Sequence, residues 1–255
     1  MLFFPTAGST NDVAAACVER WTEAGDADAL EGLVVLADAQ TAGRGRHGRV
    51  WQSPPGSGLY VSVLLTPWRA RVDPARAATL VTLAAGVALA EGVEAATGLR
   101  ADLKWPNDLL AGGRKLSGIL AEASSSTGGR GAPGLDTVIV GFGINVHPAA
   151  FPAELADRAT SIETELGRAV DRAPVLAAVL SSLAGRYEDL LAGRFDAILD
   201  AWRRRAPSAV GRRVRWTGPE GTREGVAAGI DDRGALLVRT AGGTERIVAG
   251  EVAWL

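Results

Sequence analysis

Apolar and polar positions alternate between two periods along the chain, which predicts a fold of both strands and helices. Continuous apolar runs that are typical of buried strands occupy residues 33–37, 59–66 and 137–146, and a shorter one occupies 103–105. Helical spacing predicts helices from Ser9 or Thr10 to about residue 24, from Asp73 to near Gly98, and over about 174–192 and 195–205.

The remaining pattern predicts a hairpin and a separate β-rich tail. Residues 108–110 and 115–123 are expected to pair around a glycine turn, and 124–134 is expected to be a flexible connection. Pro207 ends the last helical stretch, and short strands separated by Gly, Pro and Asp turns follow from Gly211. Such a run predicts a small β-barrel, so we expect a domain boundary near 207–210.

Composition narrows the class of protein. A net charge of -2 and a pI of about 5.8 argue against a surface built throughout for nucleic acid. The single cysteine, Cys17, excludes a disulfide within the chain and favours a reducing compartment. The first twelve residues contain no charged leader, and the apolar run at 77–90 is shorter than the ~20 residues that span a bilayer. A cytoplasmic protein is therefore expected.

Rare residue types point to one region. Of the 27 basic residues only Lys104 and Lys115 are lysines, and Asn107 is one of three asparagines. A bias toward arginine would erode lysine wherever a planar guanidinium can replace a compact ammonium, so the surviving lysines indicate positions where it cannot. These three residues lie within twelve positions of each other, which favours a site in this region.

The segment from residue 43 to residue 51 reads Gly-Arg-Gly-Arg-His-Gly-Arg-Val-Trp. Its three glycines let the backbone approach an anion and change conformation, and its three arginines offer forked donors suited to phosphate or carboxylate. The alternatives are a solvated surface loop or an arginine–glycine nucleic-acid segment. Such segments repeat in low-complexity surroundings, whereas this one is single and framed by predicted strands. The segment therefore predicts a lid over a phosphate-bearing ligand.

Three further segments place polar residues on or beside predicted strands. They read Lys104-Trp-Pro-Asn-Asp108, Lys115-Leu-Ser-Gly-Ile-Leu-Ala-Glu122 and Gly141-Phe-Gly-Ile-Asn145. On a regular strand Lys115 and Ser117 would share one face, and Gly118 would admit a ligand close to the backbone. Each segment alone also fits an ordinary turn, an edge-strand lysine or a chance glycine pair. No dinucleotide or P-loop glycine pattern and no metal-ligand spacing is present.

Taken in order, these segments resemble those of biotin protein ligases, the biotin–[acetyl-CoA-carboxylase] ligases. The resemblance covers nearly the whole chain and is carried by Ser9-Thr10-Asn11, residues 40–51, 104–108, 115–120 and 143–145, and the tail at 229–237. It implies an α+β catalytic domain over 1–207, class II synthetase-like, with a central mixed or antiparallel sheet flanked by helices, and a C-terminal SH3-like β-barrel over 208–255. Only eight residues precede Ser9, so we expect the monofunctional type without an N-terminal DNA-binding domain.

The resemblance also implies the reaction. Biotin is activated by ATP, with Mg²⁺, to biotinyl-5′-AMP, and is then transferred to a lysine of a biotin carboxyl carrier domain of acetyl-CoA or another biotin-dependent carboxylase. Lys115 would bring the two anions together, Arg44 and Arg46 would neutralise the phosphate, and Asp108 would be the general base.

The expected site residues fall into three overlapping groups. The catalytic residues are Lys115, Arg46, Asp108 and Lys104. The biotin-binding residues are Ser9, Thr10, Asn11, Gln40, Gly43, Arg44, Gly45, Arg46, Lys115 and Gly118. The ATP- and adenylate-binding residues are Arg44, Arg46, Trp51, Lys104, Asn107, Lys115 and Asn145. No side chain is expected to ligate a metal.

Three alternatives stay open at this point. A lipoate–protein ligase shares the chemistry, a biotin sensor would bind DNA, and an RNA-binding protein would use the arginine loop with the tail and Arg203–Arg205. The motifs at 44–51 and 104–108 favour biotin over lipoate, and the acidic balance disfavours DNA. Neither DNA nor a membrane is an expected partner, and a homodimer is left open.

Overall fold

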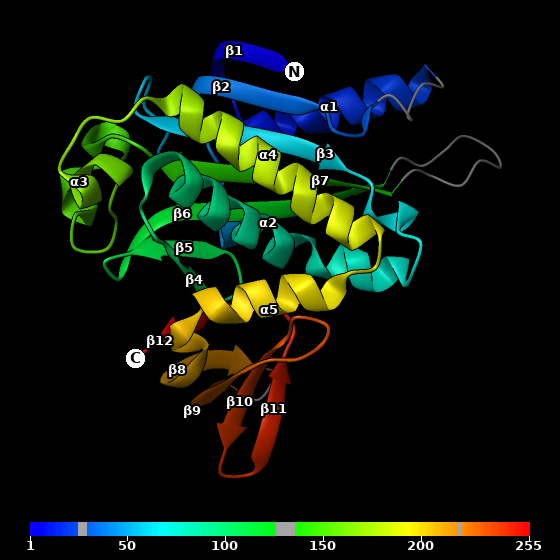
Figure 1. The fold of residues 1–255 in the computed structure, drawn as a ribbon, viewed down its shortest axis with the longest axis vertical. Helices are drawn as coiled ribbons and strands as arrows, with labels where there is room; N and C mark the ends of the chain where they lie inside the picture. Colours follow the sequence, from blue (N-terminus) through cyan, green and yellow to red (C-terminus); the bar gives the residue numbers. More distant parts are fainter. Residues whose placement is uncertain (25–29, 126–135, 219–220) are drawn as a thin grey trace.

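The computed structural model describes residues 1–24, 30–125, 136–218 and 221–255. Within these residues a seven-stranded sheet has the order β1-β2-β3-β7-β6-β5-β4 (Figure 1). Its strands are β1 (Leu2–Ala7), β2 (Val34–Gln40), β3 (Gly58–Leu65), β4 (Asp102–Lys104), β5 (Asp108–Ala111), β6 (Arg114–Ser125) and β7 (Asp136–Asn145). β1 is parallel to β2 and every other pair is antiparallel, so the sheet is mixed.

Helices cover the two faces of this sheet unequally. α2 (Pro74–Thr97), α4 (Arg172–Leu191) and α5 (Phe195–Arg205) pack together on one face. α1 (Thr10–Glu23) packs on the other face against β2, β3 and β7. The face on which α1 packs is therefore only partly covered, and the pocket described below lies on that face.

The long helix α2 follows from its ends and its composition. Asp73 is its N-cap, accepting from the backbone of Arg76, Pro74 occupies the first turn, and Gly98 caps the C-terminus at a positive φ. Its length and apolar character would suffice for a membrane span, but 72% of its most apolar window is buried inside the protein. It is the central core helix, packed between the sheet and α4.

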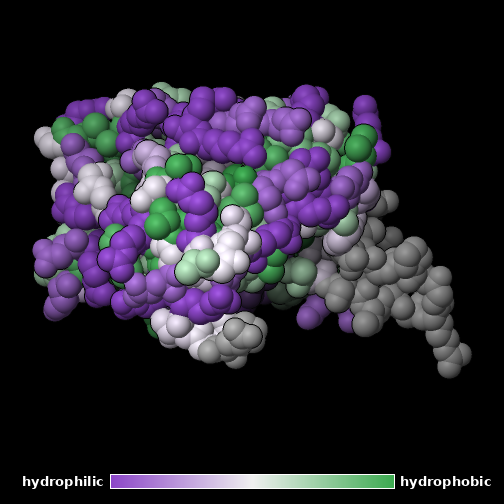
Figure 2. All heavy atoms as spheres, turned by 90° about the horizontal axis from the view of Figure 1, so that it is seen from below, coloured by the Kyte–Doolittle hydropathy of each residue, from purple (hydrophilic) through white to green (hydrophobic). Residues whose placement is uncertain are grey.

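The tail forms a second sheet with the order β11-β10-β9-β8-β12, antiparallel throughout. Its strands are β8 (Val210–Gly218), β9 (Gly221–Ile230), β10 (Leu236–Thr240), β11 (Gly243–Ile247) and β12 (Val252–Trp254). Figure 2, viewed from this end, shows mainly hydrophilic residues with smaller hydrophobic patches between them. The predicted class, an α+β unit with a small β-rich tail, is confirmed.

Two elements were not predicted. β1 contains Pro5 and three exposed positions out of its first four residues, and it forms by pairing with β2, about thirty residues away in sequence. α3 (Ile162–Leu166) is a five-residue helix capped by Ser161, too short to show a periodic pattern. The predicted connection at 124–134 lies mostly outside the described residues, and Ser124 belongs to β6.

Candidate active site

The floor of the site consists of glycines on the open face of the sheet. Gly118 of β6 is the register partner of Gly143 of β7, and Gly141 lies two residues before Gly143 on the same face. A Cβ on Gly143 would lie 2.2 Å from the indole nitrogen of Trp51, and one on Gly141 would lie 2.1 Å from Oδ1 of Asn11. The glycines are therefore required for α1 and Trp51 to rest directly on the sheet.

One end of the pocket, the amide end, holds uncharged polar groups: Ser9, Thr10, Asn11, Gln40 and Ser62. The backbone nitrogen of Thr10 donates to Oε1 of Gln40 at 2.8 Å, and Nε2 of Gln40 donates to Ser53 at 2.8 Å. Oγ of Ser62 lies 2.6 Å from Oδ1 of Asn11 and 2.8 Å from Oγ1 of Thr10. Thr10, Asn11 and Ser62 are at most 4% exposed, so their arrangement is set by the fold.

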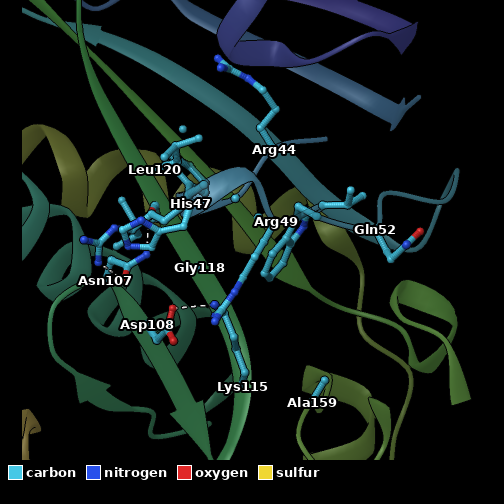
Figure 3. A pocket seen from close by; sticks show the side chains of 18 of the residues that line it. Arg44, His47, Arg49, Gln52, Asn107, Asp108, Lys115, Gly118, Leu120 and Ala159 are labelled. Atoms are coloured by element: carbon cyan, nitrogen blue, oxygen red, sulfur yellow. Dashed lines mark hydrogen bonds and ion pairs between the residues drawn. The ribbon is translucent and has the colours of Figure 1, made fainter. Parts of the chain in front are cut away.

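The other end, the charged end, comprises Arg46, Lys104, Asp108 and Lys115. Nζ of Lys115 lies 2.6 Å from Oδ1 of Asp108, and the two side chains point toward one another in Figure 3. The Lys115 ammonium also lies 5.5 Å from the centre of the Trp51 ring. The backbone of Lys115 is fixed on both sides, because its nitrogen donates to Arg158 and its oxygen accepts from Thr160.

Burial acts on two cations of the charged end. It lowers the pKa of Arg46 below its ordinary value, while the charges of Asp108 and Glu251 oppose that change. It also lowers the pKa of Lys104; Asp108 and Glu251 oppose this change, whereas Lys115 and Arg212 add repulsion. Both cations are thus partly desolvated, and an anionic ligand would relieve the cost of keeping them charged.

The loop at 43–51 is an ordered hairpin over this cavity. Its two strands meet at a bridge between Arg44 and Val50, and Gly45 donates to the carbonyl of Arg49 at 2.7 Å. His47, at the tip, has a left-handed backbone with φ 57° and is exposed. A Cβ on Gly43 would lie 2.3 Å from the carbonyl of Trp51, so glycine is needed where the hairpin closes.

The three loop arginines diverge in the structure, and the expectation that Arg44 and Arg46 together neutralise a phosphate stays a prediction. Nη2 of Arg44 lies 2.7 Å from Glu122 and 2.9 Å from Asp12, and Figure 3 shows its side chain directed away from Asp108 and Lys115. Arg46 donates to Oδ1 of Asn107 at 3.1 Å and to the carbonyl of Gly250 at 3.2 Å. Only Arg46 of the three stays among the groups of the charged end.

Arg49, the third of these arginines, pairs with Glu251 of the tail. The loop is therefore joined on one side to β6 and α1 through Arg44, and on the other side to the C-terminal sheet through Arg46 and Arg49. The tail thus reaches the mouth of the pocket.

The structure gathers nearly all the predicted site residues around one cavity of about 280 Å³. Those that line it are Ser9, Thr10, Asn11, Gln40, Arg44, Gly45, Arg46, Trp51, Lys104, Asn107, Asp108, Lys115, Gly118 and Asn145. Gly43 is buried behind the wall. Five segments of the chain, at 9–11, 40–51, 104–108, 115–118 and 145, therefore meet at one cavity.

Two predicted ligand contacts are already engaged within the protein. Nδ2 of Asn107 donates to the carbonyl of Ile119 at 2.7 Å, and its Oδ1 accepts from Arg46, so both polar ends of this amide are used. Nδ2 of Asn145 donates to the carbonyl of Thr160 at 3.0 Å. In this structure Asn107 holds Arg46 in place and Asn145 joins β7 to the segment beside Lys115.

The predicted face of Lys115 is wrong in one respect. The β5–β6 register shifts at Leu109 and Leu110, which breaks the simple alternation along β6. Gly118, not Ser117, lies beside the Lys115 ammonium: a Cβ on Gly118 would be 3.1 Å from Nζ. Ser117 is fully buried and does not line the cavity.

Several residues at the site were missed. Ser53 and Ser62 complete the amide end, Glu122 contacts both Asn11 and Arg44, and Glu251 contacts the loop. Glu122 ends a segment that was singled out, yet nothing in its local pattern indicated a partner more than a hundred residues away. The segment at 150–159 contributes four apolar residues, Ala150, Phe151, Leu155 and Ala159, and was not singled out from the sequence.

Comparison with known proteins gives two family matches. Residues 16–145 match the biotin/lipoate A/B protein ligase family, and residues 209–254 match the biotin protein ligase C terminal domain. Together the two matches take in the five-stranded sheet and every strand of the seven-stranded sheet except β1.

Relatives of known name agree. The bifunctional ligase/repressor BirA of Bacillus subtilis is 38% identical over 244 residues, which are 95% of this chain and 72% of that protein. The biotin–[acetyl-CoA-carboxylase] ligase of Paracoccus denitrificans is 35% identical over 86% of this chain and 88% of its own length. The biotin protein ligase of Aquifex aeolicus, solved in complex with biotin and ATP, superposes with a TM-score of 0.80 at 30% identity, covering 100% of this chain and 97% of that one.

Proposed function

The chain belongs to the biotin/lipoate A/B protein ligase family, and from this premise we infer that it is an ATP-dependent biotin–protein ligase. The choice of biotin over lipoate rests on the C-terminal match, which is to the biotin ligase domain, and on relatives that are biotin ligases. Biotin and ATP are the substrates of the first half-reaction.

We propose that biotin's ureido ring occupies the amide end and its carboxylate reaches the charged end. The support is the chemistry of the two ends: Ser9, Thr10 and Gln40 offer uncharged hydrogen-bonding groups, and Lys115 and Arg46 offer cations. Gly118 and Gly143 lie under the Trp51 ring, which packs directly on this part of the sheet. The indole nitrogen of Trp51 is buried with no hydrogen-bond partner among the described residues, which suits a donor awaiting a ligand oxygen.

In the first step a carboxylate oxygen of biotin attacks the α-phosphorus of ATP. An oxygen–phosphorus bond forms and the bond to pyrophosphate breaks, giving biotinyl-5′-AMP. Lys115 offsets the repulsion between carboxylate and phosphate, and Arg46 stabilises the charge that develops on the phosphoryl oxygens. Lys104 adds a second ammonium on the same side, partly buried, where a charge acts strongly on its neighbours.

In the second step the ε-amine of the acceptor lysine attacks the acyl carbon. A nitrogen–carbon bond forms, the carbon–oxygen bond to AMP breaks, and the amine proton passes to a base. We assign that base to Asp108, because its carboxylate opens into the cavity beside Lys115. A shift of the Lys115 ammonium toward the phosphate would free the Asp108 oxygen to accept a proton.

Mg²⁺ enters this proposal only with ATP. Among the described residues no group of three or more His, Cys, Asp or Glu side chains could hold an ion. Asp108, the carboxylate nearest the reacting groups, already faces Lys115. The donor set therefore fits a metal carried by phosphate oxygens, and we assign it no protein ligand.

The remaining assignments extend the same proposal. We propose a catalytic domain over 1–207 and a barrel over 208–255, supported by the change of sheet at Val210 and the match that begins at 209. We propose a biotin carboxyl carrier domain as acceptor and the cytoplasm as location, supported by the names of the relatives and the single cysteine. That the chain binds no DNA stays a prediction, and a homodimer stays open.

Incubation with biotin, ATP, Mg²⁺ and a biotin carrier domain tests the function. Mass spectrometry of the carrier should show one biotin on one lysine, and omission of ATP should abolish it. A parallel reaction contains lipoate in place of biotin. Transfer of lipoate with no transfer of biotin would overturn the assignment.

A further inference from the structure

Glu122 lies where the amide end meets the loop. A single carboxylate oxygen, Oε2, accepts from Nδ2 of Asn11 at 2.7 Å and from Nη2 of Arg44 at 2.7 Å. Asn11 belongs to α1 and Arg44 to the loop, so this side chain of β6 joins two elements that Arg44 also links directly through Asp12. The Glu122 side chain is 34% exposed, whereas Asn11 is 4% exposed.

The carboxylate fixes the direction of hydrogen bonds at the amide end. Because an ionised carboxylate only accepts, the amino group of Asn11 must face Glu122 and its carbonyl must face Ser62. Ser62 has one hydroxyl proton and lies within bonding distance of both Asn11 and Thr10. The Asn11 carbonyl can only accept, so Ser62 is the donor to Asn11, while the Thr10 hydroxyl donates to Oε1 of Gln40 at 3.2 Å and its oxygen faces Ser62.

This order reaches the ligand through Thr10, which lines the cavity. Because the Thr10 proton is directed to Gln40, the lone pairs of the Thr10 oxygen are available to Ser62 and to a ligand N–H. The second bond that the described residues offer to the Asn11 amino group, to the carbonyl of Leu120 at 3.4 Å, is too long to hold the order by itself. Glu122 therefore fixes which end of the Asn11 amide faces Ser62, and with it the acceptor that the Ser62 hydroxyl finds beside Thr10.

The same oxygen anchors the loop. Arg44 lies between Glu122 and Asp12, so its charge is engaged within the protein. Its side chain is 41% exposed, and such an ion pair alone contributes little to stability. The Arg44–Glu122 pair differs because its acceptor oxygen also binds the buried amide of Asn11. A movement of the loop at Arg44 would therefore disturb the hydrogen bond to Asn11.

We propose that Glu122 is a positioning residue of the ligase, setting the hydrogen-bond order at the biotin seat and holding the loop over the adenylate with one carboxylate. This rests on the proposed function, since the seat and the intermediate are those of biotin activation. Glu122 touches neither reacting atom, and acts through Asn11 and Arg44.

Two substitutions separate its two tasks. Glu122→Gln keeps an acceptor oxygen for Asn11 but removes the charge that holds Arg44. The KM for biotin should stay within about twofold, while biotinyl-AMP should escape about fivefold faster, as expected for one weakened ion pair. Glu122→Met has a similar length and no acceptor, so the KM for biotin should rise about tenfold and escape should also quicken. The KM for ATP should change less than the KM for biotin.

Three further variants test whether Glu122 acts on adenylate escape through Arg44 and on biotin binding through Asn11. Arg44→Ala and Asp12→Asn should quicken escape without raising the KM for biotin, because each leaves the Glu122–Asn11 bond intact. Glu94→Gln removes the partner of Arg205, an ion pair of similar exposure between α2 and α5, and should leave both readouts unchanged. Thermal melting of every variant shows whether a change follows from lost stability.

The outcomes are distinct. If wild-type protein transfers no biotin to a carrier domain, the proposed function fails first. If wild type is active and Glu122→Met keeps both the wild-type KM for biotin and the wild-type rate of adenylate escape, the positioning role is wrong. If Glu122→Gln and Glu122→Met raise the KM for biotin equally, the charge rather than the hydrogen-bond order acts on the seat, and that half of the proposal is overturned.

Discussion

The two ends of the pocket are built on different principles. At the amide end Thr10, Asn11, Gln40 and Ser62 are uncharged, buried or half-buried, and bonded to one another. At the charged end Lys115 faces Asp108 at 2.6 Å, and Arg46 donates to the side chain of Asn107 and to the carbonyl of Gly250. The amide end is complete without a ligand, whereas the charged end holds its cations with groups that a ligand anion must replace.

Because of this difference, the two ends are expected to respond differently to substitution. A preformed set of neutral hydrogen bonds recognises shape and is damaged by anything that moves it, since buried polar groups left unpaired cost about 1–3 kcal/mol each. A set of exchangeable ion pairs tolerates movement, because a cation that leaves a protein oxygen can pair with a ligand oxygen instead. Substitutions can therefore break one end while sparing the other.

The largest effect is expected from Lys115→Ala. Adenylate formation should fall by about 100-fold or more, because a positioned donor at developing charge is worth that much. The neutral amide end should still bind biotin nearly as tightly. Pyrophosphate release in a single turnover measures the first quantity and calorimetry the second.

Lys115→Arg is the matched variant. The ammonium lies 3.1 Å from the position a Cβ on Gly118 would take and faces Asp108 closely, so a planar guanidinium would overfill this space. We expect little rescue. Full activity of the arginine variant would contradict the argument that a compact cation is required.

The next effect is expected at the amide end, from Gly141→Ala. The added methyl would lie 2.1 Å from Oδ1 of Asn11, in a region with no room to relax. Overpacking of this kind costs about 1–3 kcal/mol, so biotin affinity should fall roughly 30-fold. The KM for ATP should change little.

Gly185→Ala supplies the control for that substitution. Gly185 lies within α4, where an added Cβ would meet nothing within 4 Å, so the variant should be more stable by about 0.5–1 kcal/mol with unchanged biotin affinity. Equal biotin affinity in the two alanine variants would show that the amide end is not rigid.

The contrast between the ends also explains what the sequence could reveal. Local patterns predicted α2 nearly to the residue, since its cap, its proline and its terminal glycine are all adjacent to it. Gly118 was expected to admit a ligand close to the backbone, whereas the pair in Gly141-Phe-Gly143 was a weak signal and did not indicate that Asn11 and Trp51 pack there. Lys115 and Arg46, which were singled out for their own chemistry, both line the cavity.

Residues that act through distant partners were not found. Glu122 and Glu251 are ordinary surface-type acids until the fold brings Arg44 and Arg49 to them, across 78 and 202 positions of sequence. The face of Ser117 was misassigned because a register shift in the hairpin is invisible in the alternation of residue types. Long-range pairing, not local propensity, determined each of these features.

A tenfold effect is expected from Arg46→Gly at the charged end. The variant loses the bonds to Asn107 and to the carbonyl of Gly250, and with the second of them one of the contacts between the tail and the loop. Because a hydrogen bond from a charged group is worth about 1.5–3 kcal/mol, biotinyl-AMP should escape about tenfold faster. The release of labelled adenylate after a chase measures this.

Arg49→Gly tests whether position within the loop matters. Arg49 and Glu251 are 67% and 56% exposed, and exposed pairs contribute about 0–1 kcal/mol. Escape should therefore change by no more than about twofold and should become less sensitive to salt. A larger effect for Arg49→Gly than for Arg46→Gly would reverse the roles assigned to the two arginines.

A last, modest effect is a pH dependence of ATP binding that arises at Lys104. Burial lowers the pKa of Lys104 in the free protein, so its ammonium is lost at a lower pH than that of an ordinary lysine. A bound phosphate favours the charged form, so above this lowered pKa the protein must take up a proton to bind ATP, and affinity falls as pH rises. We expect the KM for ATP to increase a few-fold across the alkaline range while the KM for biotin, set by neutral groups, stays level. Lys104→Arg keeps its charge throughout that range and should remove the increase. If the arginine variant shows the same alkaline rise in the KM for ATP as wild type, Lys104 is not the source of that rise. The pH sensitivity of the charged end would then have a cause other than burial of this ammonium.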